Sequence, residues 1–295
     1  SNVYQYLSPD SRGILQVIEV LGRPLNQAEV SFLSDVKPVQ TQRSIMQLLT
    51  TNMIAMTGSA VAGGGYETQY EMTEMAQQFF RRSYPVSVEM HRGIKKRQQS
   101  INEANVDVER RLKKSRYAFD SIVLRSTRDV IVAKMLLDAL EQAKSGDFTG
   151  AYHNVEQAKA LSADYFEVYK MGALVAFYDK KYSIARDEYR TAIEIEPKAA
   201  PLRVLYGGFL LRTFQDVEAA TEQLEIARML DPTAYQVRLE FARCRYEALN
   251  FKEAEKILTE MWVERCFDDV GEKKVIHLLL KVYHQASEKA ERESD

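Results

Sequence analysis

The sequence is poor in the residue types that metal binding and disulfide bonding require. It has two cysteines, Cys244 and Cys266, and four histidines among 295 residues. The cysteines do not stand at a metal-ligand spacing, so we interpret them as reduced thiols of a cytoplasmic protein, with a disulfide between them as the alternative. We expect no metal and no cofactor.

Long apolar runs and a strong charge of one sign are also missing. No apolar run approaches the ~18 residues that a membrane-spanning helix needs. The formal net charge is −2, which gives the whole chain no reason to bind a polyanion. With 45% hydrophobic and 28% charged residues, the composition is that of a soluble folded protein of about two domains. We therefore expect no membrane partner.

No group of residues has the pattern of a catalytic centre. Catalysis needs a nucleophile or an acid–base group that a second group holds in place. His277 and His284 stand seven residues apart on one expected helix, and neither they nor His91 and His153 form the HExxH pattern, so we interpret them as surface or interface histidines. The stretch GSAVAGGG at 58–65 lacks a following Lys-Ser or Lys-Thr and is interpreted as a hairpin tip, not a phosphate loop. We expect no catalytic residues and no enzymatic activity.

What the sequence does have is a repeat in its C-terminal half. Four alanines stand 34, 35 and 34 residues apart: Ala151, Ala185, Ala220 and Ala254. A bulky residue follows each alanine by four positions: Val155, Tyr189, Leu224 and Leu258. A small residue precedes each by twelve: Ala139, Ala173, Gly208 and Ala242. Small residues let two helices approach closely, and such a period predicts an array of helical hairpins, which make binding surfaces more often than catalytic centres.

The middle repeats resemble the tetratricopeptide repeat (TPR) family. They read GALVAFYDKKYSIARDEYRTAIEIEP and GGFLLRTFQDVEAATEQLEIARMLDP, and each ends in a proline, Pro197 or Pro232. The outer repeats lack that proline, as expected of repeats that face solvent or another domain. The resemblance covers residues 128–266. We predict a TPR-like array over 128–295, with a closing amphipathic helix at its C-terminal end.

The N-terminal residues predict a compact α+β unit. Pro9 opens a first amphipathic helix, Asn26 caps a second, and a third follows Lys37. Two strands, NMIAMTG and YETQYEM, then flank the glycine-rich turn, and Thr73 caps a last helix. The passage YETQYEMTEMAQQFF resembles the wing-to-helix passage of winged helices. The predicted fold class is mainly α, a winged-helix α+β domain at 1–84 followed by an α-solenoid of TPR-like helical hairpins.

The charges of this N-terminal unit do not favour DNA. A DNA reader carries cations on its third helix and wing. Between Ser1 and Ser83 there are six Lys or Arg and seven Asp or Glu, and the third helix carries only Arg43 in its body. We therefore interpret the unit as a protein–protein or intramolecular module.

Residues 85–127 form a predicted basic helical connector. Nine cations lie between its ends: Arg92, Lys95, Lys96, Arg97, Arg110, Arg111, Lys113, Lys114 and Arg116. Three acids, Glu103, Asp107 and Glu109, accompany them. The pattern fits a solvated charged face, and it also fits an anchor for nucleic acid or for an acidic neighbouring domain. Sequence pattern leaves both open.

The first helix of each hairpin is expected to line a groove. Projected onto that frame, the groove residues are Lys170, Phe177, Tyr178, Phe209, Arg212, Arg243 and Tyr246, with Leu174, Leu205 and Leu239 between them. Aromatic residues interleaved with arginines suit a protein or peptide ligand. The alternative is that a neighbouring domain or the closing helix covers several of them.

The order of parts resembles the C-terminal portion of STAND-type signalling NTPases. That resemblance implies that the repeats sense a protein or peptide trigger and that the winged helix relays the event to an NTPase module outside this chain. It also implies a role in antiphage defence, which many bacterial members serve. Two other classes stay open: a TPR-containing transcription regulator that binds DNA through its winged helix, and a constitutive structural adaptor.

Overall fold

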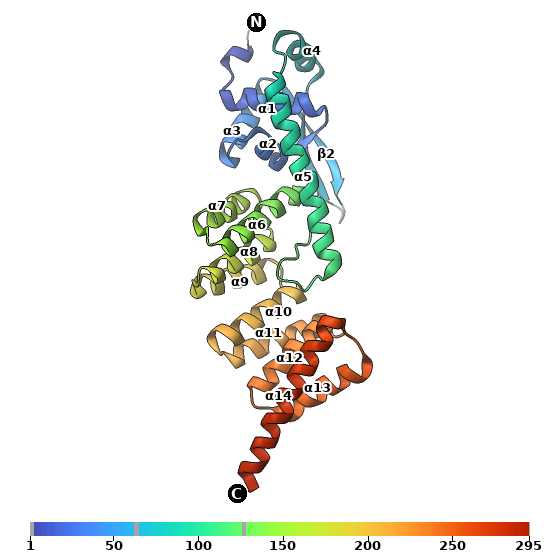
Figure 1. The fold of residues 1–295 in the computed structure, drawn as a ribbon. Helices are drawn as coiled ribbons and strands as arrows, with labels where there is room; N and C mark the ends of the chain where they lie inside the picture. The colour runs from blue at the N-terminus through green and yellow to red at the C-terminus, as the bar shows by residue number, and fades with distance from the viewer. Residues whose placement is uncertain (1–2, 62–64, 126–127, 295) are drawn as a thin grey trace. The chain divides into compact units, whose positions relative to one another are not determined.

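The computed structural model describes residues 3–61, 65–125 and 128–294 (Figure 1). The chain packs as two compact units. Unit 1 comprises Ser1–Lys114 and Asp120–Asp164, and unit 2 comprises Ser115–Phe119 and Tyr165–Asp295. The tip of the glycine-rich turn, residues 62–64, lies outside the described residues. The division by packing differs from the division by sequence pattern, which sets boundaries after residues 84 and 127.

Unit 1 begins with a short 3-10 helix, Val3–Tyr6, and three helices that start where the sequence predicts. They are α1 (Pro9–Leu21), α2 (Gln27–Ser34) and α3 (Pro38–Thr50). Gly22 ends α1 in the left-handed conformation at φ 62°, which glycine adopts without a steric penalty. Asn26 caps α2 in a reciprocal capping box with Glu29. Local capping chemistry therefore sets these boundaries.

A three-stranded antiparallel sheet follows in unit 1, in the order β1-β3-β2. Strands β2 (Ile54–Val61) and β3 (Gly65–Met72) pair along their whole length, from Ile54 opposite Met72 to Val61 opposite Gly65. The sequence predicts these two strands. It misses β1 (Leu25–Asn26), because two residues are too short for a periodic pattern, and β1 is defined only by its pairing with β3.

Helix α4 (Glu74–Ser83) is capped by Thr73 as predicted, and α5 (Val88–Lys114) spans most of the predicted connector. An apolar stripe along α5 is buried within unit 1. The stripe consists of Ile94, Ile101, Ala104 and Val108. Arg97 also donates from its Nε to the backbone oxygen of Leu33, at 2.8 Å. Composition alone reveals the charges of this segment but hides its apolar side.

The last part of unit 1 is the first hairpin of the array, α6 (Arg128–Ser145) and α7 (Phe148–Leu161). Its frame alanine, Ala151, and the small residue Ala139 are both fully buried. The start of α6 is held by Asp129, a buried carboxylate that pairs with Arg125, which also reaches Asp164 at 3.2 Å.

Unit 2 contains the remaining helices. They are α8 (Phe166–Tyr178), α9 (Tyr182–Ile195), α10 (Ala200–Phe209), α11 (Val217–Leu230), α12 (Tyr235–Glu247), α13 (Phe251–Glu264) and α14 (Asp269–Ser294). The helices α8 and α9, α10 and α11, and α12 and α13 pair as antiparallel hairpins. The predicted frame is confirmed, because Ala185, Ala220 and Ala254 are fully buried between the helices of their hairpins.

The backbone conformation of the turns within the hairpins follows the same period as the frame alanines. Each turn within a hairpin contains one residue in the left-handed region: Gly146, Lys180, Gln215 and Leu249. They stand 34, 35 and 34 residues apart, each five residues before a frame alanine. Only the first is a glycine, so the other three accept the strain that a side chain brings to this conformation. The four hairpins therefore share one turn conformation, which four different local sequences adopt.

The hairpin of α10 and α11 has one residue more than the hairpin before it, and its first helix ends differently. Residues Leu210–Phe214 form a π-helical turn directly after α10. A π turn takes an extra residue into a helix without breaking it. The insertion that lengthens the spacing from 34 to 35 is accommodated at this turn, which also carries Arg212 and Phe214 outward.

The closing helix α14 packs on the last hairpin, as the sequence predicts. Val275, Leu278 and Val282 are buried against α12 and α13. The repeat region is thus a TPR-like array of helical hairpins that ends in an additional helix.

Candidate functional site: an aromatic cluster at the hairpin turns

The structure separates the predicted groove residues into buried and exposed groups. Lys170 and Phe209 are buried, with exposed fractions of 4% and 5%. Phe177 and Tyr178 are exposed, and so is the side chain of Arg212. Arg243 and Tyr246 are half-buried. Some of the predicted groove residues therefore lie on the surface, and the others lie in the interior beneath it.

Lys170 does not face a ligand, because it pairs with Glu167 one turn earlier on α8 and both side chains are buried. A buried ammonium needs a charge partner in the low-dielectric interior. Leu174 and Leu239 are buried as well, while Leu205 is partly exposed. The buried residues of the set shape the fold of unit 2.

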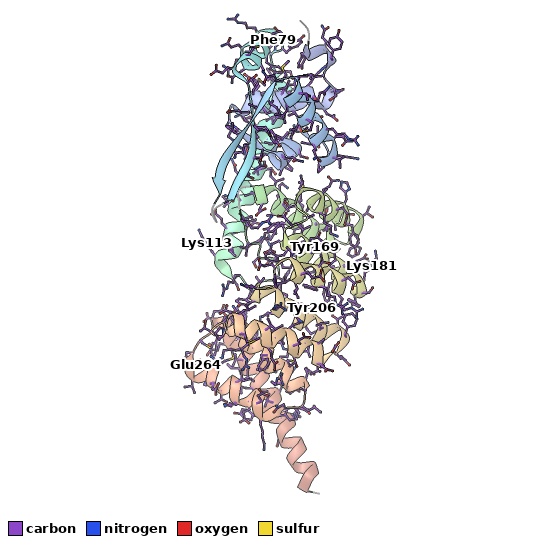
Figure 2. The ribbon with its side chains drawn as sticks, turned by 180° about the vertical axis from the view of Figure 1, so that it is seen from behind. Phe79, Lys113, Tyr169, Lys181, Tyr206 and Glu264 are labelled. Carbon is purple, nitrogen blue, oxygen red and sulfur yellow. The ribbon has the colours of Figure 1, made fainter. Side chains whose placement is uncertain are left out.

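The exposed aromatic residues gather at the turns within the hairpins, not along the middle of the first helices. We call this the turn-edge cluster and define it as the exposed rings of Phe177, Tyr178, Tyr182 and Phe214 together with the buried ring of Phe209 beneath them. Phe177 lies 5.9 Å from Tyr182 and 6.2 Å from Phe209, measured between ring centroids, and Phe209 lies 5.6 Å from Phe214. Figure 2 shows Lys181, which lies in the first of these turns, at one edge of unit 2 and Glu264, at the end of α13, at the opposite edge.

The cluster rests on a buried aromatic floor. Tyr189 stacks on Tyr206 at 5.4 Å and contacts Phe209 at 5.3 Å (Figure 2 labels Tyr206). Burial raises the pKa of Tyr189 well above its usual range, so its phenol stays neutral. Rings packed in this way hold the exposed rings of Phe177 and Phe214 in place at a low cost in side-chain entropy.

Arginines border the cluster on two sides. The guanidinium of Arg186 lies over the ring of Phe214, 5.2 Å from its centroid. Arg212 and Arg243 share the carboxylate of Glu240, at 3.2 Å and 2.6 Å. Two guanidinium groups on one carboxylate leave donors and positive charge for a ligand. The border therefore favours an anionic group beside an apolar or aromatic one.

The π-helical turn positions Arg212. A Cβ atom at Gly208 would lie 2.6 Å from Nη2 of Arg212, so the absence of a side chain at Gly208 lets the guanidinium fold back over α10. Gly208 is one of the small residues of the repeat frame, and it therefore also affects where the surface side chain of Arg212 lies.

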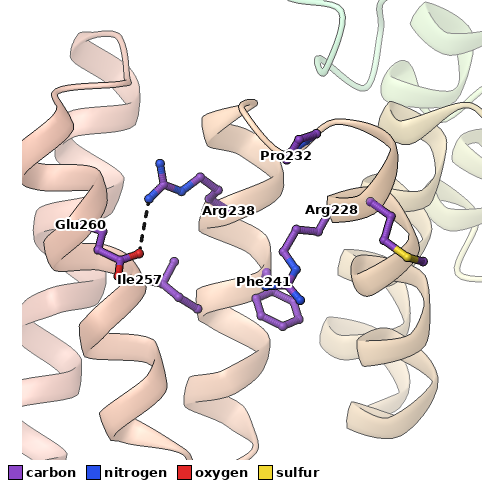
Figure 3. A pocket seen from close by; sticks show the side chains of 7 residues that line it. Arg228, Pro232, Arg238, Phe241, Ile257 and Glu260 are labelled. Atoms are coloured by element: carbon purple, nitrogen blue, oxygen red, sulfur yellow. Dashed lines mark ion pairs between the residues drawn. The ribbon is translucent and has the colours of Figure 1, made fainter.

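A separate pocket of about 430 Å³ lies between α11, α12 and α13 (Figure 3). Its lining residues are Arg228, Met229, Pro232, Arg238, Phe241, Ile257 and Glu260. The guanidinium of Arg228 stands 4.9 Å from the centroid of the Phe241 ring. Arg238 faces Glu260 at 3.8 Å and also pairs with Glu264. The pocket contains none of the predicted site residues, and its arginines already have partners within the protein.

The predicted basic residues of α5 also divide. Arg92, Lys95, Lys96, Arg110 and Lys113 are exposed. Asp107 pairs with Arg110 and with Arg111, and Arg111 reaches Asp120 at 2.6 Å. Burial raises the pKa of Asp107, but hydrogen bonds from Arg111 and Arg110 outweigh it and leave that pKa below its usual value. Lys114 is the last residue of α5. The exposed basic surface of this helix is therefore centred on Arg92, Lys95 and Lys96.

The described residues bring no metal-binding group together, since no three of their His, Cys, Asp or Glu residues form a cluster that fits an ion. Cys244 and Cys266 are both free thiols. Burial raises the pKa of the Cys244 thiol, which keeps it protonated and unreactive. His277 and His284 are exposed on α14. Across the same residues, no helix combines the length and the apolar character needed to cross a membrane.

Sequence reasoning missed three members of the site: Tyr182, Phe214 and Arg186. It projected groove positions onto the first helices only, whereas these residues lie at the start of α9, in the π-helical turn and in α9. Aromatic residues on both sides of each turn, as in Phe177 and Tyr182, were the signal that could have placed the site at the turns.

Comparison with known proteins gives fold-level similarities alone. No protein-family model matches the sequence, and no curated protein matches it. The crystal structure of yeast Tom70 is similar over 88% of this chain and 53% of its own, with 16% identity and a TM-score of 0.49. The crystal structure of a STAND protein with a tetratricopeptide repeat sensor from Pyrococcus horikoshii is similar over 97% of this chain and 53% of its own, with 12% identity and a TM-score of 0.42. This chain spans about half the length of both proteins.

Proposed function

We propose that this chain is a protein-interaction region whose repeat array recognises a protein or peptide trigger at the turn-edge cluster. The observation that carries the proposal is the exposure of large aromatic side chains at one edge, with Phe177 at 42% and Phe214 at 39%. Exposed aromatic residues bordered by arginines are the composition of interaction hot spots. The ligand that fits is a segment with an aromatic or aliphatic anchor next to a carboxylate.

The N-terminal domain at 1–84 is proposed to be a winged helix that relays binding to an NTPase module outside this chain. Three helices followed by an antiparallel strand pair support that proposal. Its few cations are also partly occupied, because Arg23 pairs with Glu29 and Arg81 with Glu19. Such a surface suits a protein neighbour better than a DNA backbone. Antiphage defence is the biological setting that the STAND resemblance implies.

The trigger site is tested by selecting peptides from a display library on the full chain and measuring their affinity for variants. We expect Phe177→Ala and Phe214→Ala each to weaken the selected peptides at least tenfold. Arg212→Ala is expected to weaken mainly the peptides that carry a carboxylate. Met229→Ala is the matched control, because Met229 is an exposed apolar residue of α11 outside the cluster. Peptides that bind all variants equally well would place the site elsewhere.

The relay is tested in a longer protein that joins this region to its NTPase module. A selected peptide should raise nucleotide hydrolysis, and Phe177→Ala should abolish the rise while basal hydrolysis stays the same. Peptide binding without any change in hydrolysis would favour the adaptor, in which the array has a constitutive partner and no switching role.

A further inference from the structure

Helix α14 has two apolar faces, and only one of them is covered by the described residues. Val275, Leu278 and Val282 are buried on the last hairpin. A second stripe, Ile276, Leu280 and Tyr283, is 39%, 63% and 50% exposed. Its members follow the i, i+4, i+7 spacing of one helix face. The stripe is available over a length of about two turns.

The repeat register identifies what kind of element belongs on this stripe. The helix α14 starts 34 residues after α12, and the first helices of the hairpins of unit 2, α8, α10 and α12, start 34 and 35 residues apart. At that offset, Ile276 corresponds to Ala242, and Leu280 corresponds to Tyr246. Ala242 is buried in the cluster that α12 and α13 share, and Tyr246 contacts Phe251 of α13 at 5.6 Å. The exposed stripe of α14 is therefore the face on which the second helix of a hairpin packs (Figure 1, the last helix in red).

The charges beside the stripe indicate the chemistry of that helix. Exposed basic residues run along one edge of the stripe: Lys273, His277, Lys281 and His284. The two second helices that precede α14 most closely, α11 and α13, are acidic, since α11 has three Glu and one Arg, and α13 has four Glu and two Lys. An antiparallel second copy of α14 would place its lysine edge against the same edge, which is repulsive.

We infer that α14 is a second docking site, for an acidic amphipathic helix of a partner protein that packs on Ile276, Leu280 and Tyr283 and completes a hairpin. The apolar stripe supplies most of the buried area, and the lysine edge selects partners with carboxylates along one side of the helix. The site is independent of the turn-edge cluster, so it does not rest on the proposed trigger.

The probe for the test is a helix-stabilised, fluorescein-labelled peptide with the sequence of α11, Val217–Leu230, because α11 is an acidic second helix. Stabilisation is needed since an isolated helix of this length is marginal in water. A matched peptide carries lysine at the places of Glu218, Glu222 and Glu225. In fluorescence anisotropy with the full chain, we expect micromolar binding of the acidic peptide and at least tenfold weaker binding of the lysine peptide.

Variants of exposed residues locate the binding. Leu280→Glu and Lys273→Glu should each weaken the acidic peptide at least tenfold, whereas Val263→Glu on α13 should leave it unchanged, since Val263 is exposed and outside the stripe. Equal binding of both peptides, or binding that survives Leu280→Glu, would overturn the inference. So would a dimer in analytical ultracentrifugation that Leu280→Glu dissociates, or binding to phosphatidylserine vesicles in place of the peptide.

Discussion

At the scale of single residues, the Asp231 carboxylate links two segments of unit 2 that are distant in the sequence. It follows α11 directly, at a helix C-terminus where a negative charge is unfavourable without a partner. Tyr117 donates its hydroxyl to the Asp231 carboxylate at 2.5 Å, and Arg116 pairs with the same oxygen. Burial raises the pKa of Asp231, but these two hydrogen bonds outweigh it and leave that pKa below its usual value. Asp231 thus fastens the segment Ser115–Phe119 to the repeats.

Replacing Asp231 with asparagine should lower the free energy of unfolding by about 1–3 kcal/mol at pH 7, because a charge-assisted hydrogen bond is lost. The folded-state pKa of Asp231 lies below its unfolded value, so its stabilisation is present above about pH 4 and is lost as the pH falls through the folded-state pKa. Denaturant unfolding at pH 7 and pH 3 checks this. Tyr117→Phe, which keeps the Arg116 pair, should lose less, and an Asp231→Asn variant as stable as wild type at pH 7 would contradict the expectation.

At the scale of elements, α10 shows how two adjacent glycines differ. A Cβ atom on Gly207 would lie 2.9 Å from Cγ of Leu224, a fully buried side chain of α11. The three atoms nearest to a Cβ atom on Gly208 would all belong to the guanidinium of Arg212, the far end of a flexible side chain. Gly207 is therefore required by helix–helix packing, whereas Gly208 sets the position of a surface residue.

We expect Gly207→Ala to destabilise the protein by about 1–3 kcal/mol through overpacking. Part of that loss is offset, since alanine favours a helix over glycine by about 1 kcal/mol. Gly208→Ala should be neutral or stabilising, because only the propensity term applies and Arg212 can turn away. Thermal unfolding of the pair measures this contrast. Equal melting temperatures for the two variants would show that Leu224 relaxes without cost.

The elements also show what sequence can and cannot predict here. The frame of buried alanines and the caps Asn26 and Thr73 follow from local chemistry, which a sequence contains. Strand β1 is defined only by its pairing with β3, which is distant in the sequence. The only sign of the π-helical turn in the sequence is a repeat that is one residue longer. Of the predicted groove residues, Phe177 and Arg212 are exposed, whereas Phe209 turns inward because it packs on Tyr189.

At the scale of the whole molecule, neither unit carries a strong net charge: the formal net charge of −2 is the sum of +1 on unit 1, with 19 Lys or Arg and 18 Asp or Glu, and −3 on unit 2, with 21 and 24. The expected DNA-reading helix, α3, carries only Arg43 in its body. On α5 of the same unit, by contrast, Arg92, Lys95 and Lys96 are exposed within two turns. The strongest local attraction for a polyanion therefore lies on α5.

This distribution distinguishes the transcription-regulator alternative from the proposed function by one measurement. We expect any binding of duplex DNA to be non-specific, with dissociation constants of about 10⁻⁵ M or weaker at physiological salt, and to weaken steeply as salt rises. Lys95→Glu combined with Lys96→Glu should remove most of it, because these side chains supply the phosphate contacts. Arg43→Glu on α3 should change it little. Fluorescence anisotropy with duplexes of several sequences, at about 50 mM and about 200 mM salt, measures how the affinity depends on DNA sequence and on salt. Tight binding to one sequence that Arg43→Glu abolishes would instead identify α3 as a DNA-reading helix, and the N-terminal unit as a regulator of transcription.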